Sequence, residues 1–219
     1  MTSDEQQRIE RIARCYPSRW LQGYARGKLR SDPVYRAAVE LLEKSDLPIL
    51  DIGCGMGLFA FYLRELGIDT PVIGVDLDER KIESARKVAA GRYANVQFLV
   101  QDGGTPVEFC GNVVIFDVLH YLSEEAQRAL LRQVTEQIPI NGVCIIRTTP
   151  RDSSWRFKLT VFEEFLLHAF RWMKAPTLCF PTAESVTTIF AELGFVTEVK
   201  PLWGKTPFNS YLFVARRKT

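Results

Sequence analysis

Short apolar runs alternate with longer amphipathic stretches along most of the chain. The apolar runs predict seven strands, at residues 48–52, 71–76, 96–101, 112–118, 142–148, 195–202 and 209–216. The stretches between them predict helices, because their apolar residues recur three or four positions apart. This alternation is typical of a doubly wound α/β sheet, and we predict a seven-stranded, mostly parallel sheet.

Capping residues indicate where several helices begin. Asp78 precedes an amphipathic stretch as an N-cap, and Ser123 precedes another that has two glutamates in its first turn. A late helix is expected from Thr182 to Leu193, closed by Gly194. These signals divide the chain into elements of ordinary length.

Two stretches fall outside the expected core. Residues 1–45 are predicted to form an N-terminal helical extension, followed by one domain over residues 46–219. Residues 150–181 are too long for a simple crossover, so we expect a helical insert that caps a substrate pocket. The insert contains several aromatic residues at helical spacing, and for most of them packing of the inserted helix is the preferred interpretation: Phe162, Phe165, Phe170 and Trp172.

Composition narrows the class of protein. The chain has 219 residues, of which 47% are hydrophobic and 25% charged, so it can bury a full core. The net charge of +2 gives no electrostatic footprint for nucleic acid. No apolar run reaches membrane-spanning length, and the first residues are acidic rather than signal-like. We therefore expect a soluble protein with no membrane span.

Cysteine and histidine usage points to a cytoplasmic protein without a metal. The five cysteines are far apart and form no C-x-x-C pair, which is typical of reduced thiols. They are Cys15, Cys54, Cys110, Cys144 and Cys179. The two histidines have no metal-ligand spacing, so no metal is predicted.

The most informative motif is P-I-L-D-I-G-C-G-M-G, at residues 48–57. An apolar strand leads into three alternate glycines, a helix follows, and a second strand ends at Asp76. Glycines at such a turn adopt positive φ and let the backbone approach a ligand closely. Strand, glycine turn, helix, strand and acid together predict a nucleotide-binding βαβ unit in which Asp76 holds the ribose hydroxyls.

Two classes of cofactor use this unit. Gly55, Gly57 and Ala60 satisfy the dinucleotide pattern G-x-G-x-x-A, which keeps a nicotinamide cofactor open. Asp51 favours S-adenosylmethionine instead, because a carboxylate at the turn repels a pyrophosphate but attracts an ammonium and a sulfonium. A structural acid or helix cap is the alternative role for Asp51.

At these residues the chain resembles the class I S-adenosylmethionine-dependent methyltransferases, over residues 47–217. The resemblance implies a Rossmann-like methyltransferase sheet with an antiparallel last strand, and it makes Asp102 the adenine-binding acid. The chain departs from the family at Asn112, a position at which members of the family often have an acid. The cofactor-binding residues that we expect are Asp51, Gly53, Cys54, Gly55, Gly57, Asp76, Leu77, Asp102, Gly103, Phe116 and Asp117.

Methyl transfer from a sulfonium mainly requires alignment and exclusion of water, although a phenol benefits from a base. His120 follows Asp117 near the end of the fourth predicted strand, and histidine is the side chain that can titrate near neutral pH, so it is the expected base. A buried histidine satisfied by backbone groups is the alternative. Tyr121 is a second catalytic candidate, for which core packing is the alternative.

A narrower resemblance concerns the acceptor. The motifs K-L-R-S-D-P-V-Y, D-V-L-H-Y-L and P-L-W-G-K-T-P-F-N-S-Y-L resemble methyltransferases of bacterial aryl polyene and xanthomonadin-type pigment clusters. That resemblance implies methylation of a hydroxyphenyl head group on an acyl carrier protein. Together with basic residues near the insert, it gives these expected substrate contacts: Tyr24, Lys28, Arg147, Arg151, Trp155 and Phe208.

We thus expect a methyltransferase of secondary metabolism that acts on a small or carrier-bound molecule, with an aromatic acceptor first. Two alternatives stay open. One is an NAD(P)-dependent oxidoreductase, and the other is a catalytically inactive cofactor-binding partner subunit, which the residue at position 112 keeps open. The acceptor atom and the oligomeric state do not follow from the sequence.

Overall fold

The structure is a computed structural model that describes residues 2–169, 178–204 and 206–218, with residues 163–169 described by their backbone alone. The chain forms two compact units, Met1–Thr105 and Pro106–Thr219. The expected boundary near residue 45 stays a prediction.

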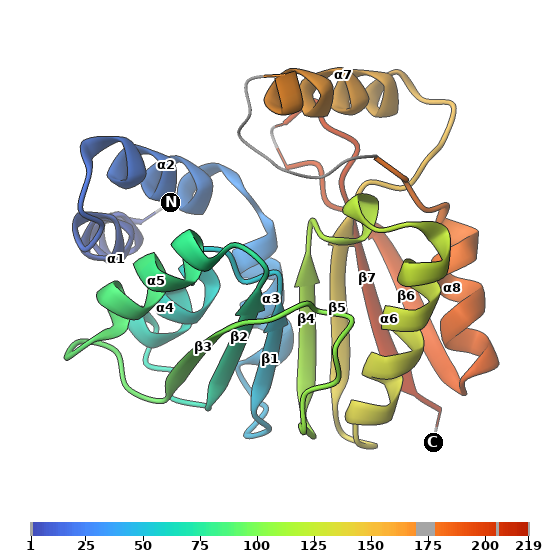
Figure 1. The fold of residues 1–219 in the computed structure, drawn as a ribbon, viewed down its shortest axis with the longest axis horizontal. Helices are drawn as coiled ribbons and strands as arrows, with labels where there is room; N and C mark the ends of the chain where they lie inside the picture. Colours follow the sequence, from blue (N-terminus) through green and yellow to red (C-terminus); the bar gives the residue numbers. More distant parts are fainter. Residues whose placement is uncertain (1, 170–177, 205, 219) are drawn as a thin grey trace. The chain divides into compact units, whose positions relative to one another are not determined.

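The first unit opens with three helices and continues as a βαβαβ segment (Figure 1). Its elements are α1 (Ser3–Arg14), α2 (Arg19–Ser31), α3 (Val34–Leu42), β1 (Ile49–Ile52), α4 (Leu58–Glu65), β2 (Val72–Asp76), α5 (Glu79–Ala89) and β3 (Val96–Val100). The three strands are parallel, with β2 between β1 and β3. Right-handed crossovers through α4 and α5 connect strands of this kind.

The second unit contains the rest of the strands and the insert (Figure 1). Its elements are β4 (Asn112–Phe116), the one-turn 3-10 helix η1 (Leu119–Tyr121), α6 (Glu124–Gln137), β5 (Val143–Thr148), α7 (Trp155–Ala169), α8 (Ala183–Glu192), β6 (Phe195–Pro201) and β7 (Tyr211–Arg217). Strands β4 and β5 are parallel, whereas β7 runs antiparallel to both β5 and β6.

The strands follow the order β3-β2-β1-β4-β5-β7-β6 in a seven-stranded sheet. The predicted fold class is therefore confirmed, including the antiparallel last strand. Each predicted strand lies within two residues of an observed one. For the buried parallel strands β1, β4 and β5, the reason is that strands buried on both faces read as continuous apolar runs.

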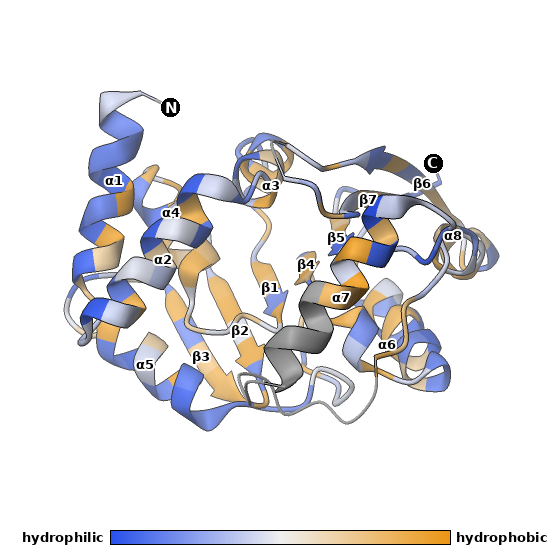
Figure 2. Ribbon diagram, turned by 90° about the horizontal axis from the view of Figure 1, so that it is seen from above, coloured by the Kyte–Doolittle hydropathy of each residue, from blue (hydrophilic) through white to orange (hydrophobic). Residues whose placement is uncertain are grey.

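Apolar side chains on the strands and on the buried faces of several helices form the cores of the two units. In the first unit, β1 is buried along its whole length, and Figure 2 shows its strands mainly in the hydrophobic colour. Helix α5 buries Ile82, Ala85 and Val88, as its spacing predicts. In the second unit the central residues of β4 are fully buried.

The predicted helix caps are confirmed by hydrogen bonds. The Asp78 side chain accepts from the N–H of Arg80, and the Ser123 hydroxyl accepts from the N–H of Ala126. Thr182 forms a capping box at the start of α8. These side chains satisfy N–H groups that have no partner within the helix.

The predicted insert contains α7 within residues 150–169. Of its aromatic residues, Phe170 and Trp172 lie outside the described residues, and so does the side chain of Phe165. Phe162 is 58% exposed, so it is not among the aromatic residues whose side chains pack in the insert. Among the helices of the described residues, none has both the length and the apolar character that a membrane span requires.

Candidate cofactor and substrate sites

The turn after β1 depends on three glycines with left-handed backbone. Gly53, Gly55 and Gly57 have φ values of 78°, 56° and 79°. The N–H of Gly55 donates to one carboxylate oxygen of Asp76 at 2.9 Å. The turn is thereby connected to the end of β2, as the βαβ interpretation requires.

Two of these glycines differ in what surrounds them. A Cβ atom on Gly57 would lie 2.7 Å from a ring carbon of Phe98, so close packing excludes a side chain there. A Cβ on Gly55 would meet nothing within 4 Å. Gly55 therefore leaves the backbone open to an approaching ligand, whereas Gly57 lets the turn pack on β3.

Asp51 is a buried carboxyl group beside the turn. Burial, and next the nearby carboxylate of Asp76, raise the pKa of Asp51 to about 7. Within the described residues, no hydrogen bond or ion pair reaches this carboxyl group. A ligand cation would supply the missing countercharge, so the site fits the ammonium and sulfonium of S-adenosylmethionine.

The other two expected cofactor-binding acids of the first unit, Asp76 and Asp102, lie at or just after strand ends. The second oxygen of Asp76 accepts from the N–H of Asp78 at 2.8 Å, and Asp102 accepts from the N–H of Gly104 at 2.8 Å. A Cβ on Gly103 would lie 2.5 Å from a methyl carbon of Ile52, so this loop packs on the end of β1. The structure therefore gathers these residues at the carboxyl ends of β1 to β3, where open sheets bind ligands.

Two further expected cofactor residues have opposite surroundings. Leu77 is 68% exposed, directly after Asp76. Cys54 is buried in the turn, where burial and then the Asp51 carboxylate raise the pKa of its thiol well above the ordinary value. The Cys54 thiol therefore stays protonated and packs as a small apolar group.

In the second unit, Asp117 and Arg147 form an ion pair at the carboxyl ends of β4 and β5. Asp117 has a left-handed φ of 57°, and its N–H donates to the carbonyl of Arg147 at 3.0 Å. The Arg147 side chain also donates to the Ser210 hydroxyl at 2.9 Å. A non-glycine residue with positive φ at a strand end is a recurrent feature of functional sites. Phe116, a half-buried residue, precedes this pair.

His120 lies in η1 with 2% of its surface exposed. Its ring stacks on Phe180, with centroids 5.4 Å apart, and lies 4.0 Å from the ring of Tyr121. The His120 carbonyl accepts from the N–H of Cys179 at 2.8 Å. The last residues of the insert are thus attached to the expected base.

The expected substrate contacts divide between the two units. In α2 of the first unit, Tyr24 stacks on Trp20 and Lys28 pairs with Asp32 at 2.8 Å. The others belong to the second unit: Arg147 at the end of β5, the exposed Arg151, the 62% exposed Trp155 and the half-buried Phe208. Their roles stay predictions.

Sequence reasoning missed a network around the loop between β6 and β7. Asn209 is fully buried, and its backbone N–H donates to the Thr160 hydroxyl at 2.8 Å. Its side-chain amide donates to the Pro150 carbonyl at 2.9 Å and to Asp152 at 3.0 Å. The loop therefore connects both to the start of the insert and to α7. The local sequence pattern does not predict these contacts.

Asn112 has a structural role. Asn112 is the first residue of β4, and its side-chain oxygen accepts from the N–H of Val143 at 3.1 Å. This end of the strand is opposite to the carboxyl end, where cofactor and acceptor chemistry is expected. The residue at this position therefore gives no support to an inactive subunit.

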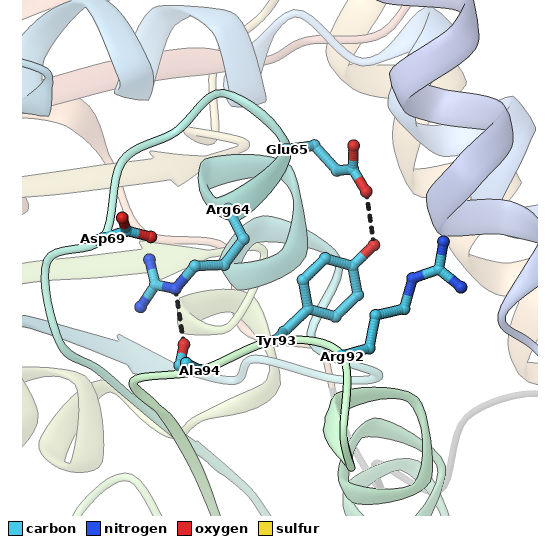
Figure 3. A pocket seen from close by; sticks show the side chains of 6 residues that line it. All are labelled: Arg64, Glu65, Asp69, Arg92, Tyr93 and Ala94. Atoms are coloured by element: carbon cyan, nitrogen blue, oxygen red, sulfur yellow. Dashed lines mark hydrogen bonds between the residues drawn. The ribbon is translucent and has the colours of Figure 1, made fainter.

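An open pocket of about 410 Å³ lies elsewhere in the first unit (Figure 3). Its lining residues are Arg64, Glu65, Asp69, Arg92, Tyr93 and Ala94. Several of them precede β2 and β3, so the pocket lies at the amino ends of these strands. Arg64 donates to the carbonyls of Ala94, Ile68, Thr70 and Asn95, and Tyr93 donates to Glu65 at 2.8 Å. These hydrogen bonds have a structural role, and the pocket is not the nucleotide site.

Comparison with known proteins agrees with this geometry. A family model described as "Methyltransferase domain" matches residues 43–179, and the chain belongs to that family. The donor used by the family is S-adenosylmethionine, so the fold and the family define the chain as a protein of the S-adenosylmethionine-dependent methyltransferase class. Membership of this family gives no support to a nicotinamide oxidoreductase.

Individual relatives place the chain within this class. It is 37% identical over 92 residues to the ribosomal protein L11 methyltransferase of Burkholderia vietnamiensis. The matched region covers 41% of this chain and 30% of that protein. The chain thus spans under a third of this curated relative.

Solved structures resemble the whole chain in fold. Magnesium protoporphyrin IX methyltransferase from Synechocystis PCC 6803, with bound S-adenosylhomocysteine, has a TM-score of 0.67 at 18% identity, covering 99% of this chain and 95% of the other. The mitomycin 7-O-methyltransferase MmcR has a TM-score of 0.67 at 18% identity, covering 99% of this chain and 61% of the other.

Proposed function

We propose that the protein transfers a methyl group from S-adenosylmethionine to the hydroxyl of a small or carrier-bound aromatic molecule. The observation that carries this proposal is the buried, uncompensated carboxyl group of Asp51 beside the glycine turn. It favours a cationic ligand and disfavours a pyrophosphate.

The chain's own residues have separate roles in this proposal. Asp51 faces the cationic part of the cofactor, Asp76 accepts from the ribose hydroxyls, and Asp102 accepts from the adenine amine. Bound at this turn, S-adenosylmethionine supplies an electrophilic methyl group and departs as a neutral sulfide. His120 accepts the proton that the acceptor hydroxyl loses as its oxygen bonds to the methyl carbon.

The nature of the acceptor is the finer part of the proposal. The resemblance to pigment-cluster methyltransferases supports a hydroxyphenyl acid, and the fold neighbours include the named O-methyltransferase MmcR. Arg147 and Arg151 are cations suited to the carboxylate or phosphate of such an acceptor or of its carrier. The aromatic rings around His120 suit a flat acceptor.

Calorimetric titration tests the cofactor. The purified protein is titrated with S-adenosylmethionine, S-adenosylhomocysteine and NADH in parallel. We expect micromolar binding of the first two and none of NADH. Binding of NADH alone would refute the assignment.

Mass spectrometry then tests the acceptor. Free hydroxyphenyl acids and their carrier-bound forms are incubated with S-adenosylmethionine, and the corresponding methyl ethers serve as matched controls. We expect the hydroxyphenyl compounds to gain one methyl group and the ethers to gain none. Methylation of the ethers at the same rate would exclude the hydroxyl as acceptor.

A further inference from the structure

A hydrogen bond joins the N-terminal helices to the middle of the glycine turn. Tyr16 lies in the short connection between α1 and α2, and its hydroxyl donates to the backbone carbonyl of Met56 at 2.8 Å. Tyr16 is 1% exposed. Met56 lies between Gly55 and Gly57, so a side chain from outside the βαβ unit contacts the centre of the turn.

This hydrogen bond orients the whole peptide group between Met56 and Gly57. The carbonyl of Met56 and the N–H of Gly57 share one rigid plane. That N–H donates to the carbonyl of Cys54 at 3.0 Å. Since glycines have many accessible backbone conformations, the Tyr16 hydroxyl restricts a peptide group in a segment that glycines flank on both sides.

Tyr16 is itself firmly placed. Gln22 donates from its side-chain amide to the Tyr16 carbonyl at 2.9 Å, and the N–H of Tyr16 donates to the carbonyl of Ala13 at 3.2 Å. Burial raises the pKa of the Tyr16 phenol well above its ordinary value, which keeps the hydroxyl a donor.

We infer that Tyr16 is a positioning residue of the cofactor site, through which the N-terminal extension sets the conformation of the glycine turn. The inference rests on the proposed function, because it assigns this turn to the cofactor. It assigns residues 2–31 a role in cofactor binding in addition to their packing.

The test compares Tyr16→Phe with Tyr62→Phe. Tyr62 is a matched control because its hydroxyl donates to Glu5 at 3.4 Å, which joins the same extension to α4 without contacting the turn. Two readouts are measured: the dissociation constant of S-adenosylhomocysteine by calorimetry, and amide hydrogen exchange at Gly55 and Gly57 without ligand.

We expect Tyr16→Phe to weaken S-adenosylhomocysteine binding about fivefold, the equivalent of one net hydrogen bond of about 1 kcal/mol. Exchange at Gly57 should become faster in this variant and stay unchanged in Tyr62→Phe. Unchanged exchange at the turn, or an equal loss of affinity in both variants, would overturn the inference. A wild-type protein that binds no S-adenosylhomocysteine would instead overturn the proposed function.

Discussion

Two influences act in opposite directions on the protonation of the Asp51 carboxyl group. Burial favours its neutral form, whereas a cationic ligand favours the ionised form. Its pKa of about 7 lies above the ordinary value of 3.8, so in the absence of ligand the folded protein keeps a proton that the unfolded chain releases. By linkage, this group makes folding less favourable as the pH rises from about 4 to about 7.

We predict that affinity for S-adenosylmethionine rises as the pH increases through about 7 and that Asp51→Asn removes this rise. The ionised carboxylate attracts the ligand, and the amide cannot titrate. Calorimetry between pH 6 and 8 measures the affinity of the wild-type protein and of Asp51→Asn at each pH. The ratio of these two affinities isolates the effect of Asp51, because any titration of the ligand itself affects both proteins equally. A ratio independent of pH would contradict the assignment of Asp51.

His120 allows a second prediction at the residue scale. His120→Ala should lower kcat by about 10² or more, the usual contribution of a general base, and leave affinity for S-adenosylhomocysteine unchanged. Tyr121→Phe compares the second catalytic candidate, because it keeps the neighbouring ring and removes only a hydroxyl. If cofactor binding fails in His120→Ala, the residue has a structural or cofactor-facing role. Steady-state kinetics and calorimetry distinguish these results.

At the scale of elements, the glycine turn combines left-handed backbone conformations with close packing. We predict that Gly57→Ala lowers the free energy of unfolding by more than Gly67→Ala. The two glycines have nearly equal φ, 79° and 78°, so the cost of a left-handed alanine, about 1–2 kcal/mol, is common to both. Only the Cβ at position 57 meets the ring of Phe98 at 2.7 Å.

Urea denaturation of the two variants measures this difference. Because the backbone cost is common to both variants, the difference between their unfolding free energies reports the contact with Phe98. Relaxation of the Phe98 ring would reduce this difference. Equal unfolding free energies would mean that β3 adapts to the extra methyl group at no cost. The packing of the turn would then not be the reason for glycine at this position.

Elements and caps follow from the sequence because they depend on neighbours within a few residues. Local pattern alone predicts the apolar strands, the N-caps at Asp78 and Ser123, and the glycine turn. The contacts that complete the sites join distant segments. Tyr16 and Met56 are 40 residues apart, and Arg147 and Ser210 are 63 apart. No periodicity encodes such pairs, so they appear only in the folded chain.

At the scale of the whole molecule, a ligand that binds only the folded state raises its stability by mass action. We predict that S-adenosylhomocysteine at 100 times its dissociation constant adds about 2.7 kcal/mol to the free energy of unfolding. For a chain of this length, the melting temperature should then rise by roughly 5–10 °C.

Differential scanning calorimetry with and without ligand measures this shift, and NADH at the same concentration is the control. A similar rise with NADH would contradict the cofactor class that the family and Asp51 indicate.

The surroundings of the cysteines decide where a thiol reagent attacks. The protonated thiol of Cys54 is a poor nucleophile, and burial likewise raises the pKa of Cys144. Cys110, by contrast, is exposed. A maleimide dye would therefore label Cys110 before it reaches the glycine turn, which would give a fluorescent protein with an intact nucleotide site. The same order of reactivity makes the Cys54 thiol in the turn less vulnerable than Cys110 to mild oxidants.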